Sequence, residues 1–187
     1  IIYEERLHGK LETDDMQNMA MAYAVSKEKK REAITEIITE LCVSGVNAIV
    51  KSEECLQQIR SLFDLDGITV FSDRGNRLVC RNGNYMAEAP DGRLGFEDEG
   101  YLSLFGDDDI FVESNMIKLR SQNPAAYAVT QEQEVGAALQ CLSRKEGIPY
   151  TMVSFEVFNR NRKWSDKDVT LLTLLGHCIG DLLNYSE

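Results

Sequence analysis

The sequence is poor in the residues from which most catalytic and metal sites are built. It has only two histidines, His8 and His177, among 187 residues. His8 lies near the start of the chain, outside the domain expected below, so the domain offers no convincing Ser-His-Asp or Cys-His set for nucleophilic catalysis. We therefore expect no catalytic residues and a chain that is not an enzyme.

The five cysteines form no recognisable site. Their number is odd, no two are spaced as Cys-x-x-Cys, and the gaps fit neither a zinc site nor a secreted disulfide framework. They are Cys42, Cys55, Cys80, Cys141 and Cys178. Each lies within an apolar run, where free cysteine behaves as a small hydrophobic residue. We expect reduced, structural cysteines and hence a cytoplasmic location.

Basic residues and long apolar runs are also scarce. Lys and Arg number 20 against 31 Asp and Glu, a formal net charge of −11. Such a surface repels nucleic-acid phosphates and anionic lipids, so we expect neither nucleic-acid binding nor direct membrane contact. Apolar stretches such as residues 171–175 fall far short of the roughly 20 residues that span a bilayer. No signal peptide is visible, and because the chain opens with Ile1, we expect a piece of a longer protein.

Acidic residues gather in one segment, at Glu97, Asp98, Glu99 and residues 107–109. The run raises the question of a Ca²⁺ site, but it lacks the ligand spacing of an EF-hand loop. A charge run of this kind is more often solvated surface. We expect no metal and no cofactor.

The apolar residues that are present change period along the chain. Helical spacing marks residues 11–41 and a second helix from about residue 52 to 63, after a strand remnant at residues 1–3. Extended runs with turn formers between them predict two hairpins, 67–72 with 77–81 and 136–143 with 151–158. Ser165 then caps a final amphipathic helix.

The middle of the chain is less regular. Residues 83–109 are rich in glycine and acids, and an insertion of that length is usually functional or mobile. We expect a strand at 110–112, a helix at 113–122 and a strand at 125–129. The element order predicts an α+β fold, a central antiparallel sheet of about five to six strands flanked by N- and C-terminal helices.

The C-terminal segment MVSFEVFNRNRKWSDKDVTLLTLLGHCIGDLL resembles the closing strand and helix of the GAF domain family, above all modules linked to GGDEF diguanylate cyclases. The resemblance covers about residues 34–185. Asn161, Arg162, Trp164 and Asp168 echo a motif of cyclic-nucleotide-binding GAF domains, with Arg for Lys, Trp for Phe and Val169 for Glu. These departures argue against cyclic-nucleotide binding and favour a role for Trp164 and Asp168 in bracing the fold.

The resemblance implies a small-ligand pocket between the sheet and the irregular central segment. By position, its lining residues would be Tyr85, Phe111, Asn115, Tyr127 and Thr151. The alternative is that these aromatic residues fill the core and leave no cavity. A pocket of aromatic and polar groups suits a small organic ligand of unknown identity.

The start of the chain resembles its end. Aligning Lys10-Leu11 with Lys163-Trp164 places Asp15 on Asp168 and apolar residues on apolar residues. We therefore interpret residues 1–33 as the tail of a preceding GAF-like module with its linker helix, and residues 34–187 as the sensor domain. Chance similarity between two capped amphipathic helices is the alternative.

The implied function is a non-catalytic sensor and dimerisation module that controls an attached output domain, such as a diguanylate cyclase, a histidine kinase or a transcription factor. Its homodimer would form through the terminal helices, using Met19, Tyr23, Leu174 and Leu182. Two alternatives are a ligand-free dimerising spacer and a redox enzyme of the GAF methionine sulfoxide reductase type. The second would need Cys80 and Cys141 on neighbouring strands. A PAS-like sensor is disfavoured by the long final helix.

Overall fold

The computed structural model describes residues 2–43, 48–72, 77–81, 84–86 and 98–185, with side-chain surroundings for 16–40, 54–71, 98–128 and 130–181. The chain forms two compact units, Ile1–Ile37 and Ile38–Glu187, which are considered separately. Nothing here tests the expected boundary between residues 33 and 34, which stays a prediction. Among the described helices, none combines the length and apolar character needed to cross a membrane.

Helix α1 (Ile2–Val43) is continuous from its first described residue. The strand remnant expected at residues 1–3 is therefore wrong, because Ile2 and Tyr3 are helical. A run of three apolar residues has no period of its own, and the helix-compatible residues after it decide its conformation. The similarity between the start and the end of the chain therefore extends to a helix in both places but not to a strand. That the start of the chain is the tail of a preceding module stays a prediction.

The second unit is built on one antiparallel sheet of six strands in the order β3-β2-β1-β6-β5-β4. The strands are β1 (Gly67–Ser72), β2 (Arg77–Arg81), β3 (Asn84–Met86), β4 (Ile110–Glu113), β5 (Val135–Lys145) and β6 (Ile148–Phe158). Both predicted hairpins form, and β1 pairs with β6 to join them. The expected α+β fold with five to six strands is confirmed.

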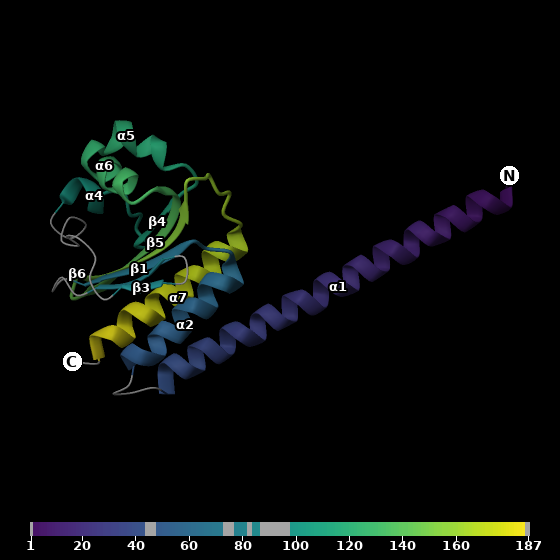
Figure 1. Ribbon diagram of the computed structural model, residues 1–187, viewed down its shortest axis with the longest axis horizontal. Helices are drawn as coiled ribbons and strands as arrows, with labels where there is room; N and C mark the ends of the chain where they lie inside the picture. The colour runs from purple at the N-terminus through teal and green to yellow at the C-terminus, as the bar shows by residue number, and fades with distance from the viewer. Residues whose placement is uncertain (1, 44–47, 73–76, 82–83, 87–97, 186–187) are drawn as a thin grey trace. The chain divides into compact units, whose positions relative to one another are not determined.

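The β5–β6 hairpin is the centre of the sheet. A two-residue turn joins its strands, and both turn residues have positive φ, 53° at Glu146 and 82° at Gly147. That conformation matches the twist of two antiparallel strands. Both strands are buried on both faces over most of their length, because helices cover each side of the sheet (Figure 1).

One face of the sheet is covered by α2 (Ala48–Phe63) and α7 (Asp166–Tyr185), as Figure 1 shows. Ser165 caps α7 as predicted, since its Oγ accepts the backbone N–H of Asp168 at 3.1 Å. Gly176 permits close packing here: a Cβ at this position would lie 2.8 Å from the Cys141 Sγ. The helix thus sits directly on β5.

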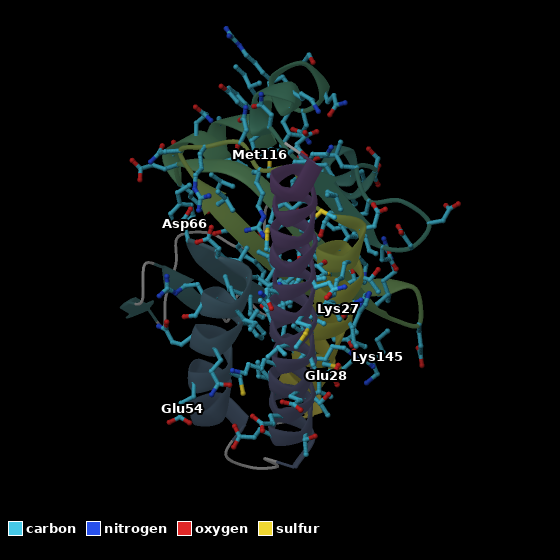
Figure 2. All side chains as sticks on the ribbon, turned by 90° about the vertical axis from the view of Figure 1, so that its right-hand side faces the viewer. Lys27, Glu28, Glu54, Asp66, Met116 and Lys145 are labelled. Carbon is cyan, nitrogen blue, oxygen red and sulfur yellow. The ribbon has the colours of Figure 1, made fainter. Side chains whose placement is uncertain are left out.

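Short helices cover the opposite face: α4 (Glu99–Leu102), η2 (Met116–Lys118), α5 (Leu119–Gln122) and α6 (Pro124–Glu132) (Figure 1). Figure 2 labels Met116 in this layer. The strand expected at 125–129 is wrong, because the Asn123 Oδ1 accepts the N–H of Ala126 at 3.0 Å and caps a helix. Proline favours the first helical position, so Asn123-Pro124 is a helix start.

Candidate functional site: a buried polar row on the sheet

Four paired residues lie side by side across the sheet, on the face that the short helices cover. The strand register places Thr69, Ser154, Gln140 and Phe111 side by side on β1, β6, β5 and β4. Paired residues of adjacent strands share one face of a sheet. Glu156 lies two residues beyond Ser154 and so faces the same way.

Five buried polar residues of this region are called the polar row below. They are Thr69, Tyr101, Gln140, Ser154 and Glu156, each less than 8% exposed. Uncompensated burial of polar groups is costly, so hydrogen bonds must satisfy them.

The hydrogen bonds of the polar row run from strand to strand and up to α4. The Gln140 Nε2 donates to the Ser154 Oγ at 3.1 Å, and the Tyr101 hydroxyl donates to the Gln140 Oε1. The Thr69 hydroxyl donates to a carboxylate oxygen of Glu156 at 3.2 Å. Burial raises the pKa of Tyr101 far above its ordinary value, so this phenol stays protonated and remains a donor.

Aromatic and aliphatic side chains surround the polar row. The rings of Tyr101, Phe105 and Phe111 contact one another with centroids 5.8 to 6.5 Å apart. Met116 and Leu119 from the short helices complete the buried cluster on one side, with other apolar residues of β5 and β6 beneath it. The polar row therefore lies in a low-dielectric setting where each hydrogen bond is strengthened.

A second set of hydrogen bonds ties α4 to α6 above the sheet. The Asp98 carboxylate accepts the backbone N–H of Tyr101 at 3.1 Å and the Asn123 side-chain amide at 3.2 Å. These bonds, led by that from Asn123, lower the pKa of Asp98. Asn123 also caps α6, so Asp98 and Asn123 together join two helices of the layer over the polar row.

The predicted lining residues are only partly brought together. Phe111 belongs to the buried cluster and Tyr127, on α6, packs against it. The Asn115 Oδ1 caps η2 by accepting the N–H of Ile117 at 3.1 Å. Tyr85 lies on β3, and its side chain is outside the described residues.

Thr151 is placed differently from the prediction. A Cβ added to Gly180 of α7 would lie 3.4 Å from the Thr151 methyl group, so Thr151 faces α7. Phe111 is in register with Gln140, which faces the short helices. Side chains alternate along a strand, and Thr151 has the parity of the α7-facing residues of β6. Thr151 therefore does not lie on the face that carries Phe111.

Sequence reasoning missed the polar row itself. Gln140, Ser154 and Glu156 are single polar residues inside otherwise apolar strands, in the runs ALQCL and VSFEVF. Alternation places all three on one face once the two strands are paired. An interrupted apolar run in a central strand was the signal that could have found them.

Cys80 and Cys141, the pair that a redox enzyme would need, lie on strands that are not neighbours. Cys141 is buried against α7, and burial raises the pKa of its thiol to about 12, which keeps it protonated at neutral pH. Cys80 lies on β2, and two strands, β1 and β6, separate β2 from β5. Adjacent strands are about 4.8 Å apart, so β2 and β5 are separated by roughly 14 Å across the sheet. The expectation that their strands could be neighbours is wrong.

The acidic segment forms an ion pair with the central hairpin. Asp109 forms an ion pair with Arg144, whose Nε lies 2.7 Å from the carboxylate. Within the described ranges, no three His, Cys, Asp or Glu side chains gather as a group that could hold a metal ion.

The motif residues between β6 and α7 brace the domain. The Arg162 guanidinium lies 4.5 Å from the centre of the Trp164 ring and 3.6 Å from the Asp168 carboxylate. The Trp164 indole N–H donates to the backbone carbonyl of Glu113, at the end of β4, at 3.2 Å. These contacts join the start of α7 to the sheet edge, which supports the bracing interpretation of Trp164 and Asp168.

Comparison with solved structures identifies the architecture. A GAF domain from an Acinetobacter phosphoenolpyruvate-protein phosphotransferase matches 84% of this chain and 94% of its own length, with 13% identity and a TM-score of 0.58. The phycoerythrobilin-bound GAF domain of a cyanobacterial phytochrome matches 86% of this chain and 97% of its own, with 8% identity and a TM-score of 0.64. The chain therefore has the GAF fold.

A longer neighbour gives the same result. The chromophore-binding domain of Stigmatella aurantiaca bacteriophytochrome matches 83% of this chain, with 14% identity and a TM-score of 0.62, and this chain spans 60% of its length. No protein-family model matches the sequence, and no curated protein matches it. The likeness is thus one of fold, and function must be argued from the site.

Proposed function

We propose that this chain is a regulatory module that senses a small organic ligand held against the polar row. The observation that carries the proposal is the position of the row, buried between the sheet and the aromatic residues of the short helices. Apolar walls with a few convergent polar groups are typical of small-molecule sites.

The solved neighbours support a ligand of this kind. One is a GAF domain with bound phycoerythrobilin and another is a chromophore-binding domain. The fold therefore accepts an organic ligand in those proteins. In this chain, Gln140 and Ser154 would exchange their mutual hydrogen bond for hydrogen bonds to the ligand. Ligand binding would thereby change the hydrogen bonds on the face of the sheet that the short helices cover.

The proposal extends to the setting of the module. It acts as a homodimer in the cytoplasm, joined through the terminal helices, and regulates an output domain such as a diguanylate cyclase without catalysing a reaction itself. The side chains of Met19 and Tyr23 on α1 and of Leu174 on α7 support this, since they are exposed by 73%, 70% and 49%. Leu182, the fourth residue expected there, has its side chain outside the described residues. A ligand shifts the dimer only to the extent that it prefers one conformation.

Thermal denaturation against a library of small metabolites tests the ligand proposal. A ligand that binds the folded chain raises the melting temperature in a concentration-dependent way. The Gln140→Leu variant, which removes the centre of the polar row, should lose this shift. The Ser143→Ala variant, on the other face of the same strand, should keep it. A ligand that stabilises Gln140→Leu as strongly as the native chain would contradict the site.

One observation favours the ligand-free spacer as a second candidate. Hydrogen bonds within the protein already link members of the polar row, as in a row that only joins α4 to the sheet. In that case no metabolite raises the melting temperature, while the chain still dimerises.

A further inference from the structure

The stretch of α1 from Met16 to Lys29 carries apolar side chains that no other part of the described chain covers. Every side chain from Met16 to Lys29 is exposed, including Met16 at 69%, Met19 at 73% and Tyr23 at 70%. Most helices in proteins owe their stability to packing of an apolar face. This stretch of α1 therefore needs a partner that packs against it.

The positions along this stretch have a symmetry of their own. One face of the helix carries a heptad-like series at spacings of 4, 3, 4, 3 and 4 residues, which reads the same in both directions about Met21. The series, called the seam below, is Glu12, Met16, Met19, Tyr23, Ser26 and Lys30. Two such helices running in opposite directions would place Met19 of each beside Tyr23 of the other.

Charged residues lie at both ends of this stretch, acidic before it and basic after it. Residues 16–26 carry no charge; residues 12–15 before them hold three acidic side chains, and residues 27–31 after them hold four basic ones. An antiparallel pair brings the acidic end of each helix against the basic end of the other. A parallel pair would instead place Glu12 beside Glu12 and Lys30 beside Lys30 within the seam, where like charges repel.

We infer that residues 12–31 of α1 bind the same segment of a second copy of this chain in antiparallel orientation. The inference rests on the proposed function for the homodimer and adds its orientation and its contact residues. Asp15 and Lys29 are 14 residues apart and therefore occupy the same heptad position, on one side of the seam. In an antiparallel pair of helices, residues at this position contact residues at the same position of the other helix. Each Asp15 therefore faces a Lys29 of the second copy.

Charge exchange between Asp15 and Lys29 tests the orientation in the full chain by sedimentation equilibrium. Asp15→Lys and Lys29→Asp each replace two attractive contacts with repulsive ones and should weaken dimerisation about tenfold. The double variant Asp15→Lys/Lys29→Asp restores opposite charges and should regain most of the native affinity. Glu28→Lys makes the same charge change as Asp15→Lys on the side away from the seam and should have little effect (Figure 2 labels Glu28).

The possible results separate this inference from the homodimer itself. A chain that dimerises with neither single variant weakened, or with a double variant no better than the singles, overturns the antiparallel pairing and leaves the homodimer standing. A chain that is monomeric at every concentration overturns both. Circular dichroism of each variant verifies that α1 remains helical, and the affinity of the native chain should fall with added salt.

Discussion

The two faces of the central hairpin differ in chemistry although they belong to the same strands. On the α7 side, β5 and β6 present Leu139, Val153 and Phe155, which are at most 1% exposed. On the other side the same strands present Gln140, Ser154 and Glu156, equally withdrawn from water but hydrogen-bonded. At these positions the α7 face of the strands is apolar, whereas the other face combines buried apolar residues such as Leu142 and Met152 with hydrogen-bonded polar groups.

The difference extends to how closely the helices approach. On the α7 face two glycines, Gly176 and Gly180, bring the helix close to the side chains of β5. A Cβ at Gly176 would lie 2.8 Å from the Cys141 Sγ, and one at Gly180 would lie 2.8 Å from the Ser143 Oγ. On the opposite face, the rings of Tyr101, Phe105 and Phe111 belong to the buried cluster between the sheet and the short helices. Substitutions that change the volume of a buried side chain are felt on both faces.

The largest expected effect comes from the α7 face. Phe155→Ala removes a fully buried ring from the centre of β6 and should lower the free energy of unfolding by about 3–5 kcal/mol. Urea denaturation measures it. Val112→Ala, on the exposed side of the edge strand β4, is the matched control and should cost about 0.5 kcal/mol or less. Equal losses would contradict the close packing of the Phe155 ring against α7.

A smaller effect is expected from the polar row. Tyr101→Phe removes one hydroxyl and leaves the Gln140 Oε1 without that donor, which should cost about 1–3 kcal/mol. Tyr101→Phe combined with Gln140→Leu should cost less than the sum of the two single changes, because partners in one network are coupled. Additive losses in urea denaturation would show that the two side chains act independently.

The smallest effect concerns Asp98 and acid pH. Hydrogen bonds lower the pKa of Asp98 in the folded chain below its ordinary value of 3.8. Its carboxylate therefore stabilises the fold at pH values above 3.8, and this contribution is lost as the pH falls through the lowered pKa. The difference in melting temperature between the native chain and Asp98→Asn should therefore shrink from pH 6 to pH 3. Asp107→Asn, the same charge change at an exposed site, serves as control. A constant difference would contradict the role of Asp98.

The sequence was most informative where one signal dominated. Ser165 followed by acids and a helical stripe predicted α7. Turn formers at residues 144–147, between two β-rich runs, predicted the central hairpin, whose turn is Glu146-Gly147. The sequence misled at residues 125–129, where Tyr and Val suit a strand but Asn123-Pro124 begins a helix that the alanines favour. Local capping outweighed β-propensity there.

Site residues were harder to predict than elements. Thr151 was predicted to line the pocket from its position in the chain. Its place in the alternation of side chains along β6 instead turns it toward α7. Tyr101 belongs to a segment with no regular apolar period, and nothing in the sequence links it to Gln140, 39 positions away. The face of a strand is decided by its pairing, which is a long-range property.

The amino-acid sequence by itself determined the α+β class, the final helix and its cap. These follow from local periodicity and residue chemistry. Only the tertiary structure decided which strand lies beside which, and thereby that Cys80 and Cys141 are apart while Tyr101, Gln140 and Ser154 are joined. Contacts between distant segments depend on how the strands pair and the helices pack, and a local pattern does not encode that pairing.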